Sequence, residues 1–417
     1  MKAKYNLPSK IFFCKKCVMS NQRPASIPEF FHTKERKNAK YLNINDDGIC
    51  DACKHHEIKE QINWREREKK LIKLLDKHRK NNGEYDCLVP GSGGKDSAFQ
   101  AHVLKYKYNM NPLVITWPPI LYTDYGFKNY NNWIDIGGFD ALVYRPNGKS
   151  MKELTKLSII NLLHPFQTFI LGQKNIAPKI AAKFGIKLVF YGENEAEYGN
   201  PIAENNVSLR KKSYFAVKNY NNIFLAGIKI SDLIKKYKFK YQDLKIFLPT
   251  NYNEIKKTKI EIHYLGYYLK WTPQEAFYYA AKNTGFAPRP HRTQGTFSKY
   301  NSIDDKIDDI HFYTYGVKFG VARATYDACQ EIRNGDINRD EGKMLVKRFD
   351  HEFPKRFLKE IFDYLSISKR EFPDHYKLFE QPIMNERYFK KLCDNFRSPH
   401  LWYNEKNKWK LRKAVWM

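Results

Sequence analysis

The chain has 417 residues, 42% of them hydrophobic, and a formal net charge of +28 from 73 Lys and Arg against 45 Asp and Glu. This length predicts two or three domains, and no apolar run is long enough to span a membrane. The start of the chain has no apolar segment typical of a signal peptide, so we expect a cytoplasmic protein.

The positive charge is carried mostly by lysine, in a chain that is also rich in Asn, Ile, Tyr and Phe. Such a composition is typical of a solvated surface encoded by an AT-rich genome. RNA-binding surfaces depend more on arginine and on interleaved aromatic residues. We therefore do not expect nucleic acid as a partner, although a basic surface suits ATP and an anionic substrate.

Two C-x-x-C pairs lie within residues 1–56, separated by residues 18–49. Two thiolates from each tight turn complete a tetrahedral site, and an odd total of seven cysteines favours metal binding over disulfides. A redox dithiol is the competing interpretation, but the strand that precedes such a pair in thioredoxin-like folds is missing. We therefore predict a structural Zn²⁺ module over residues 1–56. Its ligands are Cys14, Cys17, Cys50 and Cys53.

Residues 57–84 carry a charged helical pattern, which predicts one connecting helix. From 85 to about 200, short apolar runs alternate with helical patterns. The runs are Cys87–Pro90, Leu113–Trp117, Ala141–Tyr144 and Lys187–Tyr191, and the helical patterns lie near 96–107, 150–162 and 174–184. This alternation predicts an α/β domain over 85–260, a doubly wound parallel sheet with helices on both faces. The polar, Lys-rich stretch 202–260 is predicted to form an insertion or lid.

A glycine-rich segment follows the first apolar run and opens the first helical pattern. Glycines let the backbone approach phosphate oxygens, and a helix N-terminus favours anions. The Walker pattern G-x-x-x-x-G-K-[ST] is absent. The segment instead resembles the pyrophosphate loop of the ATP pyrophosphatases, which split ATP into AMP and pyrophosphate. The predicted ATP-binding residues are Ser92, Gly93, Gly94, Lys95, Asp96, Ser97 and Trp117, with Asp96 also holding Mg²⁺.

Residues 261–417 are predicted to form a mostly helical region that binds substrate or a partner protein. Thr272–Glu275 has the spacing of a capping box, and Gly285 is a plausible stop for that helix. Asn338–Glu341 and Ser368–Glu371 repeat the spacing and predict two further helices.

Three further segments, together with the cysteine pairs and the loop, resemble the N-acetyl sugar amidotransferase family of pyrophosphate-loop enzymes over roughly Cys14 to Pro354. The segments are Gly192–Gly199, Thr296–Tyr300 with the acidic run to Asp309, and Lys318–Gly335. Position 322 is Ala where the family favours Gly. The family is associated with acetamidino sugars of bacterial surface polysaccharides and flagellar glycans.

The resemblance implies a fold similar to adenine nucleotide alpha hydrolases and an ATP-dependent reaction on an N-acetylated sugar. ATP adenylates the acetamido oxygen, ammonia replaces AMP, and the group becomes acetamidino. The catalytic residues implied are Asp96, Glu193, Lys299 and Arg323.

No cysteine carries a glutaminase signature, so we expect ammonia to come from separate glutaminase and cyclase-like partner subunits. The alternative function is a thiolase-like, tRNA-modifying pyrophosphate-loop enzyme. Such enzymes pass sulfur through cysteines near the pocket, whereas only Cys329 and Cys393 follow the loop here, far apart in the sequence. A zinc-bearing binding protein with a vestigial loop is a third interpretation.

Overall fold

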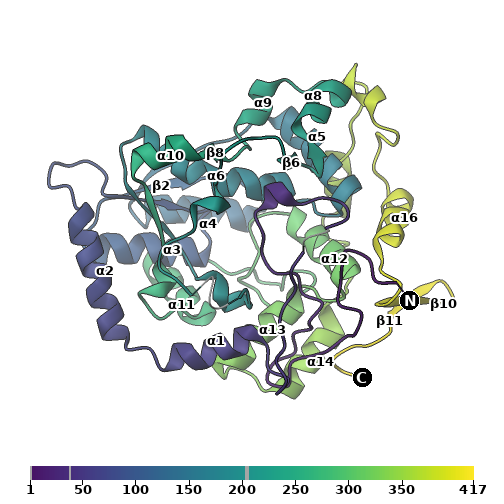
Figure 1. Ribbon diagram of the computed structural model, residues 1–417, viewed down its shortest axis with the longest axis horizontal. Helices are drawn as coiled ribbons and strands as arrows, with labels where there is room; N and C mark the ends of the chain where they lie inside the picture. The colour runs from purple at the N-terminus through teal and green to yellow at the C-terminus, as the bar shows by residue number, and fades with distance from the viewer. Residues whose placement is uncertain (1, 37–38, 202–205) are drawn as a thin grey trace.

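The computed structural model (Figure 1) describes residues 2–36, 39–201 and 206–417. It has a five-stranded sheet with the order β3-β2-β1-β4-β9. Each pairing between neighbouring strands in it is parallel. The strands are β1 Cys87–Pro90, β2 Pro112–Thr116, β3 Asp140–Val143, β4 Leu188–Tyr191 and β9 Glu261–Tyr264. The strand order reverses between β1 and β4, where parallel α/β sheets bind ligands outside the strand ends.

Helices cover both faces of the sheet, as the alternating pattern predicted. Leu88 and Leu113 pack into one buried cluster with α5 and α6, whereas Val89 and Val114 pack into a second with α3 and α11. The helices of this part are α3 Lys95–His102, continued by a π-helical turn at Val103–Lys107, α4 Asp124–Asp135, α5 Gly148–Leu162 and α6 Gln167–Lys183. The prediction of a doubly wound parallel sheet is therefore confirmed.

The stretch predicted as an insertion folds against the sheet domain and contributes to its first core cluster. Its elements are β5 Ala216–Val217, β6 Phe224–Leu225, β7 Ile228–Lys229, α8 Ile230–Tyr237, α9 Tyr241–Lys245, β8 Thr250–Asn251 and α10 Tyr252–Thr258. The start of that stretch, residues 202–205, lies outside the described residues. The predicted boundary at residue 260 falls one residue before β9, the fifth strand of the sheet.

The predicted connecting helix is instead two helices, α1 Asp51–Glu60 and α2 Trp64–His78. α1 begins directly after Cys50, inside the predicted zinc module, so the helix does not start at residue 57. The side chain of Asn63 caps α2 by accepting from the amide of Glu66, which separates the two helices. Leu71 and Leu75 of α2 are buried, whereas Ile58 of α1 is 41% exposed.

The C-terminal part is mostly helical and ends in a hairpin. Its elements are α11 Pro273–Thr284, α12 Ile307–Phe319, α13 Arg323–Asn334, α14 Arg339–Phe349, α15 Leu358–Tyr364, α16 Glu386–Phe396, β10 Trp402–Glu405 and β11 Lys408–Leu411. The predicted caps at Thr272 and Asn338 are present. At Ser368 the hydroxyl accepts from the amide of Glu371, but a turn forms instead of the predicted helix. Pro373 explains this, because it disfavours helical backbone at the residue before it.

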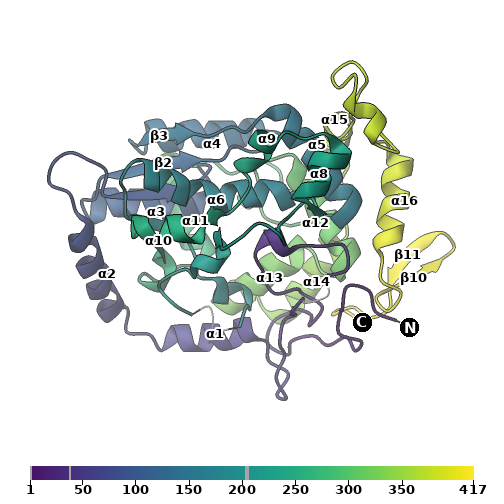
Figure 2. The same cartoon turned by 45° about the horizontal axis from the view of Figure 1, so that its top comes forward.

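The N-terminal segment, which includes the 3-10 turn η1 Glu29–Phe31, runs beside α13 and α14, and the two ends of the chain lie close together near β10 and β11 (Figures 1 and 2). The four N-terminal cysteines share a buried cluster with Ala328, Cys329 and Val346 of α13 and α14. The predicted zinc module is therefore packed onto the C-terminal helices. Within the described residues, we find no helix with both the length and the apolar character needed to cross a membrane.

Candidate functional site

The glycine-rich loop, residues 91–97, joins β1 to α3 at the point where the strand order reverses. Gly93 has a φ of +80°, and a Cβ there would come within 2.7 Å of the backbone of Asn129 and Tyr130 in α4. Gly94 caps α3 with its backbone, and the Ser97 hydroxyl donates to its carbonyl over 2.9 Å. The loop therefore presents a helix N-terminus to the carboxyl edge of the sheet, as an anion site requires.

A cavity of about 430 Å³, called here the main cavity, opens over this loop. It is lined by the loop, by residues of α4, α6 and the segment after β4, and by residues 300–330 of the C-terminal part. Pro119, Trp271 and Phe286 complete the lining. Of the predicted site residues, it brings together Ser92, Gly93, Gly94, Lys95, Asp96, Glu193 and Arg323.

The Asp96 carboxylate is held from two sides. Lys95 Nζ lies 2.6 Å from Asp96 Oδ2, and Trp271 Nε1 donates to Oδ1 over 2.9 Å. Lys95 is buried, and its ammonium lies 5.6 Å from the centre of the Trp271 ring. These contacts fix both charged groups at the start of α3, beside the N-terminal amides of that helix.

Glu193 follows β4 and accepts a hydrogen bond from the Tyr198 hydroxyl. Burial raises the pKa of the Glu193 carboxyl, and the nearby charge of Asp96 adds to this rise. A carboxyl group with a raised pKa is a better proton acceptor once it is ionised. Glu193 can therefore act as a base in the main cavity.

Carboxylates from the C-terminal part enclose the opposite side of the main cavity. Asp304 accepts from the Ser92 hydroxyl over 2.8 Å, so the acidic run reaches the glycine-rich loop directly. Asp305 accepts from the amides of Ile120 and Leu121, and burial raises its pKa to about 7. Burial and Asp304 raise the pKa of Asp308 well above its ordinary value. Mg²⁺ bound to phosphates needs one or two carboxylates, which Asp96 and Asp304 can supply.

Arg323 is the first residue of α13, and Asp327 orients it. The Nε of Arg323 donates to Asp327 Oδ1 over 2.9 Å, while Thr296 and Asn301 donate to the same carboxylate. The guanidinium lies 5.5 Å from the centre of the Phe312 ring and lines the main cavity. This geometry suits a fixed clamp for an anion.

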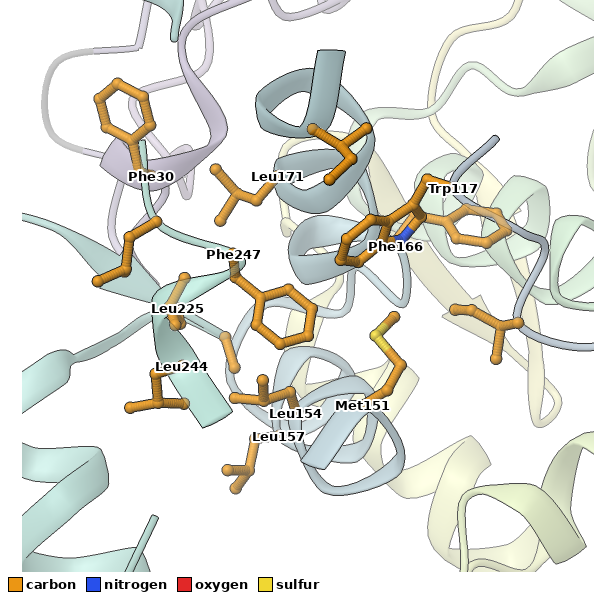
Figure 3. Close-up of a cluster of buried hydrophobic side chains, with 14 of the residues drawn as sticks. Phe30, Trp117, Met151, Leu154, Leu157, Phe166, Leu171, Leu225, Leu244 and Phe247 are labelled. Carbon is orange, nitrogen blue, oxygen red and sulfur yellow. The ribbon is translucent and has the colours of Figure 1, made fainter. Parts of the chain in front are cut away.

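Three predicted residues do not line the main cavity. Ser97 belongs to the glycine-rich loop, but its hydroxyl donates to the carbonyl of Gly94. Lys299 is exposed and does not line the main cavity. Trp117 is 3% exposed, stacks on Tyr144 and packs against Phe247, among the buried side chains in Figure 3. It lines a smaller cavity at the strand ends that also contains Glu193 and Tyr198.

Several side chains that the fold brings into the main cavity could not be assigned a role from the sequence alone. They are Tyr198, Trp271, Tyr300, Asp304 and Asp308. The acidic run was visible in the sequence, but its contact with Ser92 spans 212 positions of the chain.

The four predicted cysteine ligands converge, with all their Sγ atoms within 4.8 Å of one another and all four residues buried. Cys14 Sγ lies 3.8 Å from Cys53 Sγ, and Cys17 Sγ lies 3.7 Å from Cys50 Sγ. Zn–S bonds of about 2.3 Å in a tetrahedron place sulfur atoms about 3.8 Å apart. The cluster therefore has the size that a zinc ion requires. Arg339 of α14 donates to the carbonyls of Cys14 and Cys17, which anchors the first pair.

Part of the chain matches a known protein family. Residues 294–415 match the family model described as LPS biosynthesis protein WbpG-like, C-terminal domain. The matched range includes Arg323, Asp304, Asp308 and Asp327 of the main cavity.

The chain is also similar to an uncharacterized protein of Methanocaldococcus jannaschii, with 33% identity over 84 residues. That match covers 20% of this chain and 29% of the relative, so the chain spans under a third of the relative's length. Among solved structures, an NMN synthetase from Francisella tularensis aligns with 15% identity and a TM-score of 0.24. The alignment covers 34% of this chain and 57% of that one, and a similarity of this size adds nothing to the description of the fold.

Proposed function

We propose that this chain is an ATP-dependent amidotransferase that converts the acetamido group of an N-acetylated sugar, free or nucleotide-linked and carrying an acid group, into an acetamidino group. Ammonia is the nitrogen donor, and AMP and pyrophosphate are released. The observation that carries the proposal is the placement of the loop with the sequence Ser-Gly-Gly-Lys-Asp-Ser at the reversal point of a parallel sheet, facing a cavity with Glu193 and Arg323.

The loop is suited to the first half of this reaction. The amide oxygen of the sugar attacks the α-phosphorus, a new P–O bond forms, and pyrophosphate leaves. The amides at the start of α3 and the Lys95 ammonium stabilise the negative charge that develops on the leaving group. Mg²⁺, bound through Asp96 and Asp304, would neutralise phosphate charge.

The second half needs a base and an anion clamp. Ammonia attacks the imidate carbon, the C–O bond to AMP breaks, and a proton leaves the new nitrogen. Glu193 can take that proton, and Arg323, fixed by Asp327, can hold the departing phosphate. No protein nucleophile is required, because ammonia fills that role.

The match of residues 294–415 to an LPS biosynthesis family supports a sugar as the substrate. A thiolase-like tRNA-modifying activity is less well supported. The main cavity lining contains no cysteine among the described residues, and Cys329 and Cys393 are buried in helices. Sulfur transfer would need a thiol at the reacting carbon.

The test is to incubate the protein with ATP, Mg²⁺, ammonium and a panel of N-acetylated sugars and nucleotide sugars. We expect AMP and pyrophosphate in equal amounts, formed only with a suitable sugar, and a product in which one oxygen is replaced by NH. Formation of ADP and phosphate would contradict the proposal.

Glu193→Gln should lower the rate by about 10²- to 10⁴-fold, the usual contribution of a general base. Burial raises the pKa of Glu193, so the folded state disfavours the charged carboxylate. The free energy of unfolding therefore falls as the pH rises from the ordinary pKa through the raised pKa. Glutamine carries no charge, so the variant should melt no lower than the wild type at neutral pH. At constant free-ammonia concentration, the wild-type rate should rise with pH through the raised pKa, whereas the variant should lack this rise.

The isolated chain should use ammonium but not glutamine. A glutaminase needs an activated cysteine, and Cys87, Cys329 and Cys393 are all buried, while the other four cysteines form the cluster. We propose that glutaminase and cyclase-like partner subunits supply ammonia to this chain. Product formation with glutamine as nitrogen source should appear only when such partners are added, and glutamine-dependent turnover by this chain alone would refute this.

A further inference from the structure

A second cluster of metal-binding side chains lies away from the four cysteines. Glu29, His32 and His164 bring one ligand atom each within 4.8 Å of one another. His32 Nδ1 lies 2.8 Å and His164 Nε2 lies 3.4 Å from the same carboxylate oxygen, Glu29 Oε2. Ligand atoms around a tetrahedral ion with bonds of about 2.0–2.1 Å lie about 3.3 Å apart, so these separations are close to those of a metal site.

The contacts among these three side chains do not satisfy the carboxylate by hydrogen bonding. Glu29 Oε2 is buried and, among the described residues, has no hydrogen-bond partner of acceptable geometry, although two imidazole nitrogens are near it. Glu29 and His32 are 9% and 7% exposed. A buried carboxylate oxygen without a hydrogen bond costs free energy unless a cation or another ligand binds it.

Short connections and a hydrogen bond bring the three side chains of the cluster together. Glu29 begins η1, and His32, three positions later, is the residue that caps it, so their side chains lie on the same side of one turn. His164 lies in the tight connection between α5 and α6, after Leu163 in the left-handed conformation. Gln167 at the start of α6 donates to the carbonyl of Glu29 over 2.8 Å and ties the two segments together.

We propose that Glu29, His32 and His164 bind a divalent transition-metal ion, with Zn²⁺ as the best fit, that fastens the N-terminal segment to the α5–α6 connection. Two imidazoles and one carboxylate favour zinc over calcium or magnesium, which prefer oxygen ligands. Three protein ligands leave the fourth position open for water or a small anion.

Glu29, His32 and His164 also line a side cavity of about 210 Å³. Arg23, Arg36 and Lys318 also line this side cavity, and the Nε atoms of both arginines are buried without a hydrogen-bond partner among the described residues. Such a wall favours an anionic fourth ligand, such as hydroxide or a carboxylate. The side cavity and the main cavity share the side chains of Ile170, His311 and Tyr326, so the ion would lie next to the catalytic space without being part of the glycine-rich loop.

The test is metal content after saturation with Zn²⁺ and dialysis. His164→Gln and Glu29→Gln should each bind one equivalent fewer than the wild type. His375→Gln is the matched control, because His375 contacts Glu153 over 2.8 Å in a two-residue pair outside both clusters, and it should bind as much zinc as the wild type. Equal zinc content in the wild type, His164→Gln and Glu29→Gln would overturn the proposal.

The absorption spectrum of bound Co²⁺ distinguishes the two clusters. Thiolate ligands give a strong sulfur-to-cobalt charge-transfer band, which a site of two histidines and a glutamate lacks. His164→Gln should lose one cobalt equivalent while this band stays unchanged, which also shows that the variant is folded at the cysteines. If His164→Gln lost this band together with the metal, the variant would be misfolded. The same measurement on Glu29→Gln would then test the proposal. This readout involves no turnover, so it stands apart from the proposed sugar chemistry.

Discussion

Replacing Asp96 by Asn should lower the rate of AMP and pyrophosphate formation by about 10²- to 10³-fold. The substitution keeps the shape of the side chain and the acceptor for Trp271 but removes the negative charge next to Lys95. Without that charge the loop loses a ligand for Mg²⁺ and the ion pair that positions the Lys95 ammonium. The measurement is the rate of AMP release with ammonium and a reactive sugar.

Asp124→Asn provides the matched control. Asp124 also lies in the first turn of a helix, α4, but it is exposed and does not line the main cavity. This control should keep the wild-type rate, and both variants should melt close to the wild type. Normal turnover by Asp96→Asn would show that the glycine-rich loop is not the catalytic phosphate site.

The parts of the site that could be predicted are those with local sequence signals. A strand, a glycine-rich turn and a helix start lie within Cys87 to Ser97, so the loop could be predicted from residues adjacent in the sequence. The four-cysteine cluster could be predicted for the same reason, because two short motifs contain all four of its cysteines. Gly285 likewise ends α11 in the left-handed conformation expected of a helix stop.

The parts that could not be predicted depend on contacts between distant segments. Trp117 ends an apolar run and was predicted to bind ATP, but its ring is buried against Gly172 and Phe247. Lys299 was one of many lysines with no local feature to separate an exposed side chain from one in a site. The strand β9 was missed because it follows a polar stretch and alternates the polar Glu261 and His263 with apolar residues. Its pairing with β4 therefore decides its structure.

The four-cysteine cluster should carry one zinc ion, and Cys17→Ser should remove it. Structural zinc in small peptides contributes about 10–16 kcal/mol of binding free energy, comparable to the whole stability of a typical domain, about 5–15 kcal/mol. The N-terminal segment has few helices or strands of its own before α1. Loss of the ion should therefore unfold this segment, although Arg339 still anchors the first cysteine pair to α14.

Metal analysis tests the loss of zinc, and limited proteolysis tests the unfolding of the N-terminal segment. We expect Cys17→Ser to bind one zinc fewer than the wild type, to be cleaved within residues 1–56, and to lose turnover, because α13 carries Arg323 and packs against the cysteine cluster. Cys393→Ser makes the same change at a buried thiol of α16, outside the cluster, and should keep its zinc. Cys17→Ser with wild-type zinc content and protease resistance would show that the cysteines are not ligands. An iron–sulfur absorption band in the wild type would instead assign a different metal to the same four thiolates.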